Sequence, residues 1–158
     1  MNFLAHAYLS GGHTQILLGN VIGDFIKGRQ ALAGLDAPIA AGVELHRAID
    51  EFTDNHEVVH NSKKRLRPKY RHYAGVIVDV FYDHFLAVNW KKFHHQTLAD
   101  FARDTYATLQ HFSNALPADF QMMLPEQAPA AIAESYQRYS QHQPHLVLMG
   151  LVGRLNFS

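Results

Sequence analysis

The sequence contains no cysteine, which excludes disulfides and thiolate chemistry, so a metal site in this chain must use His, Asp, Glu or Asn. No apolar run approaches the roughly 20 residues that cross a bilayer. The first residues carry no basic region before their apolar part, so we expect no signal peptide and a cytoplasmic location. Fourteen basic residues balance fourteen acidic ones, so the net charge points to neither a nucleic-acid partner nor a membrane surface.

Signals for β-structure are also missing. No segment alternates regularly between apolar and polar residues, and no Asn-Gly or Asp-Gly pair marks a hairpin. The 158 residues suit one domain, which we expect to be a compact, all-α, single-domain helical bundle over residues 1–158. Helices are expected at 2–9, 14–28, 37–55, 56–67 (ending at Pro68), 72–91 and 97–113, with short helices between the later prolines.

Histidine is the one unusual count, at twelve residues. In the helix expected at 37–55, successive residues lie 100° apart, so Ile39 and Val43 mark the side that faces the core. His46 and Asp50 lie on this apolar side, four residues apart. They form either part of a functional site or a core histidine that the aspartate orients.

The segment 72–91 is apolar on nearly all sides, so we expect it to be buried. Asp79 and Asp83 lie in its middle, four residues apart, and His84 follows. Two neighbouring buried carboxylates repel each other, and each loses hydration, unless a cation pairs with them. The segment supplies no nearby Lys or Arg, which favours a divalent ion. The alternative is helix capping or a structural ion pair.

Weaker pairs occur earlier in the chain. Asn20 and Asp24 are four residues apart, but the pattern alone favours a solvated edge for them. Gly19 and Gly23 have the same spacing and predict the close approach of another helix. His6 lies on the first helix, where the pattern alone favours no functional role.

Aspartate and histidine pairs on separate helices suit a divalent ion such as Mn²⁺, Mg²⁺ or Fe²⁺. Such an ion lowers the pKa of bound water and neutralises phosphoryl oxygens, which indicates hydrolysis of a phosphate ester. No glycine-rich phosphate loop, Gly-x-Ser-x-Gly or Rossmann motif competes with this interpretation. Two alternatives stay open: a general metal phosphohydrolase acting on nucleotides or small phosphate esters, and a non-enzymatic helical binding module.

A local basic segment breaks the balance of charge. It is either a solvated helix end or a docking surface for an acidic partner. Salt would weaken the attraction between such a partner and the basic segment. No aromatic residues interleave with it in the manner of a nucleic-acid site. Its members are Lys63, Lys64, Arg65, Arg67, Lys69 and Arg71.

Four motifs occur in order between residue 2 and about residue 90. They are Asn2-Phe3-Leu4-Ala5-His6, Gly19-Asn20-x-x-Gly23-Asp24-Phe25 with Gly28, His46-Arg47-x-Ile49-Asp50-x-x-Thr53-Asp54, and Asp79-x-x-x-Asp83-His84-x-Leu86 with Trp90. Together they resemble the acyl carrier protein phosphodiesterase (acyl carrier protein hydrolase) family. Beyond residue 91 the resemblance is loose, and the chain ends earlier than typical members do.

The resemblance implies an all-α fold related to the HD phosphohydrolases in distorted form. It also implies hydrolysis of the phosphodiester between 4′-phosphopantetheine and a serine of acyl carrier protein, with Mn²⁺ as an effective metal. Acyl carrier proteins are strongly acidic, which gives the basic segment a partner. One departure is that HD relatives carry adjacent His-Asp, whereas this chain has Asp83-His84 in the reverse order.

Pattern and resemblance together assign three roles, and leave the oligomeric state open. The expected metal ligands are Asp24, His46, Asp50 and Asp83. The groups expected to position water, protonate the leaving serine oxygen or assist the metal are His84, His6 and Asp79. The expected substrate contacts are Asn20, Lys27, Arg29, Arg47, Lys63, Lys64, Arg65 and Arg67.

Overall fold

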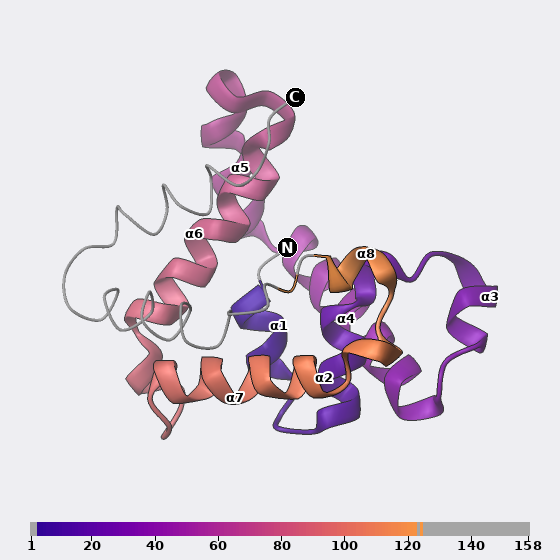
Figure 1. The fold of residues 1–158 in the computed structure, drawn as a ribbon. Coiled ribbons are helices and arrows are strands. Elements are labelled where there is room, and N and C mark those ends of the chain that lie inside the picture. Colours follow the sequence, from indigo (N-terminus) through magenta and orange to yellow (C-terminus); the bar gives the residue numbers. More distant parts are fainter. Residues whose placement is uncertain (1–2, 123, 125–158) are drawn as a thin grey trace.

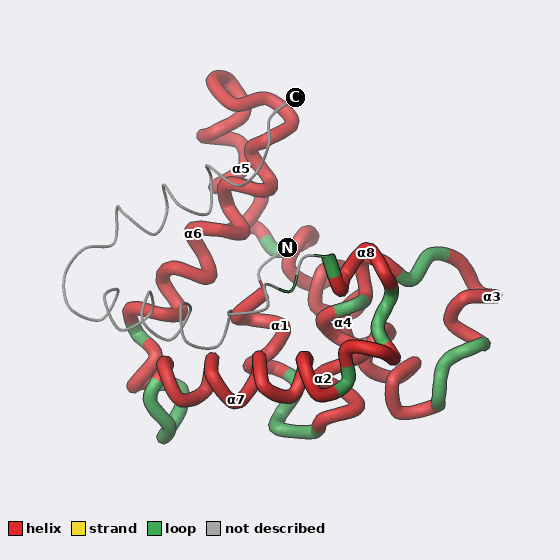
Figure 2. The backbone as a smooth tube through the Cα atoms, viewed as in Figure 1, coloured by secondary structure: helices red, strands yellow, loops and turns green. Residues whose placement is uncertain are grey.

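The structure, a computed structural model, describes residues 3–122 and residue 124. Within these residues, helices are joined by short loops and no strand occurs (Figure 1, Figure 2), which confirms the all-α prediction. An HD-like arrangement stays a prediction. The helices are α1 (Phe3–Leu9), α2 (Thr14–Val21), η1 (Gly23–Phe25), α3 (Gly28–Ala33), α4 (Ala37–Asn55), α5 (Glu57–Tyr70), η2 (Arg71–Tyr73), α6 (Ala74–Val88), η3 (Trp90–Lys92), α7 (Leu98–His111), η4 (Ser113–Ala115) and α8 (Ala118–Gln121).

Helices α2 and α4 form the tightest crossing of the fold. A Cβ atom built on Gly19 would lie 2.8 Å from the Cα of Gly42, and one built on Gly42 would lie 2.9 Å from the backbone nitrogen of Asn20. Only glycine lets two helix backbones approach this closely. The predicted close approach at Gly19 is therefore confirmed.

Two apolar clusters hold the helices together. The larger cluster joins α2 and α4 to α7 and α8, and the smaller one joins α1 to the end of α6 and the start of α7. Burial of this apolar surface is the main stabilising contribution. The buried members of the larger cluster are Ala7, Leu17, Leu18, Val21, Ile22, Val43, Leu109, Leu116 and Phe120, and those of the smaller one are Leu4, Ala87, Trp90 and Leu98.

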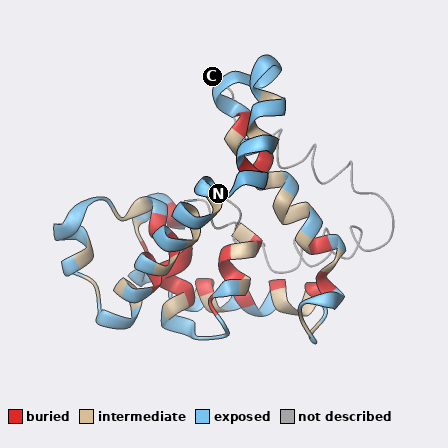
Figure 3. Cartoon of the chain, turned by 180° about the vertical axis from the view of Figure 1, so that it is seen from behind, coloured by how far each residue is buried: buried red, intermediate tan, exposed pale blue. Residues whose placement is uncertain are grey.

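Helices α5 and α6 form a hairpin that projects from the rest of the molecule (Figure 1). Figure 3 shows mostly exposed residues along its outer part. The prediction that the segment 72–91 is buried on nearly all sides is wrong, because several large side chains of α6 are exposed, although it packs against α5 and α1. Its large exposed side chains are Val76, Phe81, Phe85 and Val88. No helix among the described residues has the length and hydropathy that a bilayer crossing requires.

Two predicted helix boundaries are wrong. The segment 14–28 is not one helix: α2 ends at Val21, the short helix η1 follows, and Gly28 begins α3 with a positive φ of 84° instead of ending a helix. Helix α5 also runs past Pro68 to Tyr70. Proline cannot donate a hydrogen bond to the carbonyl four residues earlier, but this carbonyl lies on an exposed part of the helix where water can bind it.

Helix α4 matches the predicted range 37–55. Asp36 stands at its N-cap and Pro38 in its first turn, although the Asp36 side chain makes no capping hydrogen bond. A short helix follows Pro117, as expected. The short helices predicted around the later prolines lie outside the described residues.

The close crossing of α2 and α4 predicts that a side chain added at Gly19 lowers the stability of the fold. Replacement of Gly19 by Ala should lower the free energy of unfolding by about 1–3 kcal/mol or more, because the added methyl group meets the backbone of α4. Urea unfolding followed by circular dichroism measures this. Gly34→Ala is the matched control, since its Cβ would meet its nearest neighbour at 3.7 Å. Equal effects of the two substitutions would contradict the proposed crossing constraint.

Candidate metal centre

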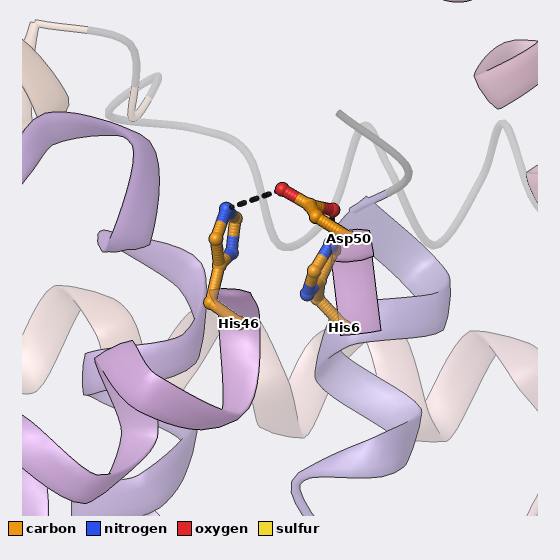
Figure 4. Close-up of side chains that lie close together, drawn as sticks. All are labelled: His6, His46 and Asp50. Atoms are coloured by element: carbon orange, nitrogen blue, oxygen red, sulfur yellow. Dashed lines mark hydrogen bonds and ion pairs between the residues drawn. The ribbon is translucent and has the colours of Figure 1, made fainter. Parts of the chain in front are cut away.

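Two buried imidazole rings lie face to face at the contact between α1 and α4. His6 comes from α1 and His46 from α4, and their ring centroids are 4.2 Å apart with an interplanar angle of 20°. Their side chains are 1% and 4% exposed. Figure 4 shows both rings directed toward the carboxylate of Asp50, which lies one turn beyond His46 on α4.

Two carboxylates face the Nε2 atoms of these rings. Asp50 bridges both: one oxygen lies 3.2 Å from Nε2 of His6, and the other lies 3.1 Å from Nε2 of His46. Asp24, on η1, places an oxygen 3.2 Å from the same Nε2 of His46. Both carboxylates are about half exposed, at 49% for Asp24 and 47% for Asp50. The group is therefore closed by imidazoles on the core side and open to solvent on the carboxylate side.

The distances in this group fit a divalent ion. Atoms of His6, His46 and Asp50 that can bind a metal all lie within 4.8 Å of one another. Neighbouring ligands of an octahedral ion with bonds of about 2.2 Å are about 3.1 Å apart. The three nitrogen–oxygen distances of 3.1–3.2 Å match that spacing. Imidazole nitrogen and carboxylate oxygen together suit Mn²⁺, Fe²⁺ or Zn²⁺.

The charges of the group also favour a cation. Burial lowers the pKa of His46, but hydrogen bonds with Asp24 and Asp50 outweigh burial and raise it to about 9. The hydrogen bond with His46 lowers the pKa of both carboxyl groups, and the bond with His6 adds to this at Asp50. A proton on His46 thus offsets only one of the two negative charges of Asp24 and Asp50 in the metal-free protein. A metal ion that took this place would release the proton.

Local contacts hold Asp24 beside α4. A Cβ on Gly23 would overlap the imidazole of His46, so the glycine lets η1 lie directly against the ring. One residue after His46, the guanidinium of Arg47 donates a hydrogen bond of 3.1 Å to the carbonyl of Ile26. The turn that carries Asp24 is therefore tied to α4 at both of its ends.

Asp83 lies apart from this group and bonds to the first turn of α1. Its two carboxylate oxygens accept hydrogen bonds from the backbone nitrogens of Leu4 and Ala5, at 2.9 and 3.0 Å. Burial raises the pKa of Asp83 to about 6, although these two hydrogen bonds act in the opposite direction. The carboxylate thus satisfies two free N–H groups of a helix N-terminus. Neither Asp79 nor His84, its neighbours on α6, belongs to the His6–His46–Asp50 cluster.

The structure places the predicted substrate contacts in several environments. Asn20 is fully buried, so it is not on a solvated edge and its side chain is closed to a substrate. Arg47 is exposed but bonds to the backbone, and Lys63 forms an ion pair with Asp54. The remaining residues of the set are exposed: Lys27, Arg29, Lys64, Arg65 and Arg67.

The sequence pattern does not predict the polar contacts behind the imidazoles. The Nδ1 atoms of His6 and His46 each lie 2.7 Å from an oxygen of Asn20, the side-chain oxygen and the backbone oxygen respectively. Ser10 bonds to both Asn20 and the His6 carbonyl. The four-residue spacing between His6 and Ser10 could have placed Ser10 on the same face of the first helix.

Comparison with known proteins extends the likeness beyond the four motifs. The family model described as acyl carrier protein phosphodiesterase matches residues 1–157. A protein named acyl carrier protein phosphodiesterase from Photorhabdus laumondii is 38% identical over 92 residues, which are 58% of this chain and 46% of that protein. A protein of the same name from Yersinia enterocolitica is 36% identical over 123 residues, or 77% of this chain and 63% of that protein.

A third relative of the same name, from Escherichia coli, is 34% identical over 113 residues, which are 69% of this chain and 58% of that protein. The chain therefore spans about half to somewhat under two thirds of the length of these curated relatives. No solved structure matches the chain.

The bridging position of Asp50 predicts a loss of metal affinity when it is replaced. Asp50→Asn removes the one carboxylate that faces both imidazoles, so the affinity for Mn²⁺ should fall by about 100-fold or more. Isothermal titration calorimetry of the metal-free protein measures this. Asp54→Asn, one turn further along α4, is the control and should bind Mn²⁺ as the wild type does. Equal affinity of all three proteins would remove Asp50 from the site.

The environment of Asp83 predicts that its contribution to stability decreases as the pH rises. Because its pKa is higher in the fold than its ordinary value of 3.8, the folded protein binds this proton more tightly than the unfolded chain does. The corresponding stabilisation is complete below about pH 4 and is lost as the pH rises through 6, by up to about 3 kcal/mol.

The comparison is with Asp83→Asn, which does not ionise. The stability of the wild type relative to this variant should decrease between pH 4 and pH 7 in urea unfolding. A constant difference across this range would exclude the raised pKa. Mn²⁺ affinity measured on the same samples separates capping from ligation, since a residue that supports the site through α1 should weaken binding much less than the ligand replacement Asp50→Asn does.

Proposed function

The chain belongs to the acyl carrier protein phosphodiesterase family, and we propose that it hydrolyses the phosphodiester between 4′-phosphopantetheine and a serine of holo acyl carrier protein. The products are apo acyl carrier protein and free 4′-phosphopantetheine. The observation that carries this proposal is the convergence of two imidazole nitrogens and two carboxylates at the edge of the core. This donor set suits metal-dependent hydrolysis of a phosphate ester.

His6, His46, Asp50 and Asp24 are the proposed ligands of a divalent ion, with Mn²⁺ as the first choice and Mg²⁺ or Fe²⁺ as alternatives. A bound divalent ion supplies an acidified water and neutralises a non-bridging phosphoryl oxygen. The buried rings fix the inner side of the site, whereas the half-exposed carboxylates leave its outer side open to water and phosphate. His6 is better suited to ligation than to proton transfer, because its side chain is 1% exposed.

The leaving serine oxygen needs a proton, and His84 remains the proposed donor, with Asp79 as its neighbour on α6. Asp83 supports the site through α1, since it holds the first turn of the helix that carries His6. His6 itself follows one residue after Ala5, the second of the two residues whose backbone Asp83 binds. Asp83 therefore belongs to the support of the site in this proposal, and not to its ligands.

The proposed partner is the acidic surface of acyl carrier protein, met in the cytoplasm. Lys64, Arg65 and Arg67 are exposed along the projecting helix α5, and Lys27 and Arg29 follow soon after Asp24. Charges of one sign on a protruding element attract an oppositely charged protein over a distance set by ionic strength. Arg47 and Lys63 contribute less to this surface, because each is already bonded within the chain.

The decisive test is incubation with holo acyl carrier protein and Mn²⁺, followed by mass spectrometry of the carrier protein. We expect loss of the 4′-phosphopantetheine group, no reaction after chelation, and no reaction with Asp50→Asn. Asp54→Asn is the control and should react as the wild type does. Faster hydrolysis of nucleotides or small phosphodiesters than of the carrier protein would instead favour a general phosphohydrolase, and inactivity on all substrates would favour a binding module.

The basic segment predicts that its replacement weakens substrate binding and leaves the chemical step nearly unchanged. Replacement of Lys64, Arg65 and Arg67 by Glu should raise the KM for holo acyl carrier protein by about tenfold or more at low salt, with kcat little changed. Hydrolysis of a small phosphodiester should be unaffected. The control replaces Lys91 and Lys92, exposed in η3, by Glu. A similar KM for both variants would exclude a docking role for α5.

A further inference from the structure

The side chain of Asn20 has only one orientation that satisfies its neighbours. It is 0% exposed, so water does not compete for its polar atoms. Its Nδ2 donates hydrogen bonds to the carbonyl of His6 at 2.8 Å and to Oγ of Ser10 at 3.0 Å. The hydroxyl of Ser10 donates to the same carbonyl at 2.9 Å, which leaves its oxygen to accept from Asn20. The amide oxygen of Asn20 must therefore face the other way, toward the ring of His6.

Two oxygens of Asn20, one from its side chain and one from its backbone, face the Nδ1 atoms of the two imidazoles. The amide oxygen of Asn20 only accepts, and it lies 2.7 Å from Nδ1 of His6. The backbone oxygen of the same residue also only accepts, and it lies 2.7 Å from Nδ1 of His46. Each Nε2 also faces an oxygen that only accepts, but at 3.1–3.2 Å. Because the bonds at Nδ1 are shorter, at 2.7 Å, the geometry favours the proton of each neutral ring on Nδ1, with the lone pair of Nε2 toward the carboxylates.

We propose that Asn20 is a positioning residue that holds both imidazoles in the Nδ1–H form, so that both Nε2 atoms can bind the same divalent ion. This inference rests on the metal site of the proposed function, but it concerns the metal-free protein and can be tested without turnover. A nitrogen lone pair that faces a carboxylate oxygen at 3.2 Å is repelled unless a cation or proton lies between them. Asn20 therefore prepares the site for a positive charge before any metal binds.

The two bonds of Asn20 to the imidazoles are separable, because one comes from its side chain and the other from its backbone. Asn20→Ala removes the amide oxygen but keeps the backbone oxygen at the same position. His46 should therefore remain in the Nδ1–H form. His6 should change to the Nε2–H form, because its Nε2 can then donate to Asp50 while Nδ1 has lost its acceptor.

The first experiment is long-range proton–nitrogen correlation NMR of the imidazoles in the metal-free protein at pH 10, above the pKa of about 9 that the carboxylates give His46. We expect Nδ1–H signals for His6 and His46 in the wild type, and a change at His6 alone in Asn20→Ala. A wild-type His6 in the Nε2–H form would overturn the proposal even if the variant failed to fold. An unchanged His6 in a folded Asn20→Ala would do the same.

The second experiment measures Mn²⁺ affinity by calorimetry on the same proteins. Asn20→Ala should bind Mn²⁺ about 10–100-fold more weakly. Ser10→Ala is the matched control, because it loses buried hydrogen bonds next to Asn20 but keeps the bond to Nδ1 of His6. It should keep the wild-type affinity and the Nδ1–H form, and equal weakening of both variants would overturn the proposal. If the tautomers are as expected but holo acyl carrier protein is not hydrolysed, this result contradicts the proposed function and leaves the role of Asn20 intact.

Discussion

The close crossing of α2 and α4 is the constraint on which the rest of the structure depends. Because Gly19 and Gly42 carry no side chains, the two backbones come close enough for the carbonyl of Asn20 to reach the ring of His46. Gly23 then lets the next turn lie directly against this ring. A single backbone contact thus places a buried amide, an imidazole and the carboxylate of Asp24 at one point.

The site draws its geometry from groups that never need to meet a substrate. Asn20 fixes the backs of the rings, Asp83 fixes the first turn of α1, and Arg47 holds the turn before α3. The cost of burying two imidazoles next to two carboxylates is offset by hydrogen bonds on the inner side and by solvent on the outer side. The same division leaves the outer side as the proposed entry for a phosphate ester.

The projecting hairpin has a different physical character from the core. The larger apolar cluster joins α2, α4, α7 and α8, outside the hairpin. Along α5, by contrast, exposed cations follow one another. Exposed charges contribute little to the stability of a fold, but they determine which surfaces attract it. The chemistry and the proposed docking surface are therefore carried by separate parts of the same chain.

Much of the site could be predicted because helical periodicity is a local property. The range of α4, the inward direction of His46 and the adjacency of His46 and Asp50 all follow from residues four positions apart. The same reasoning placed Asn20 and Asp24 on one helix, and it failed because the break after Val21 depends on a neighbouring helix. It also could not show that Asp83 turns to the N-terminus of α1.

The amino-acid sequence by itself determined an all-α fold and a small set of inward carboxylates and imidazoles, since both depend on spacing along a helix. Only the tertiary structure decided which of these groups meet. It joined His6 to a pair on α4 and directed Asp83 to a helix end. It also buried Asn20 behind both rings. These outcomes depend on the angle and distance at which helices cross, and helices cross according to side chains far apart in the chain.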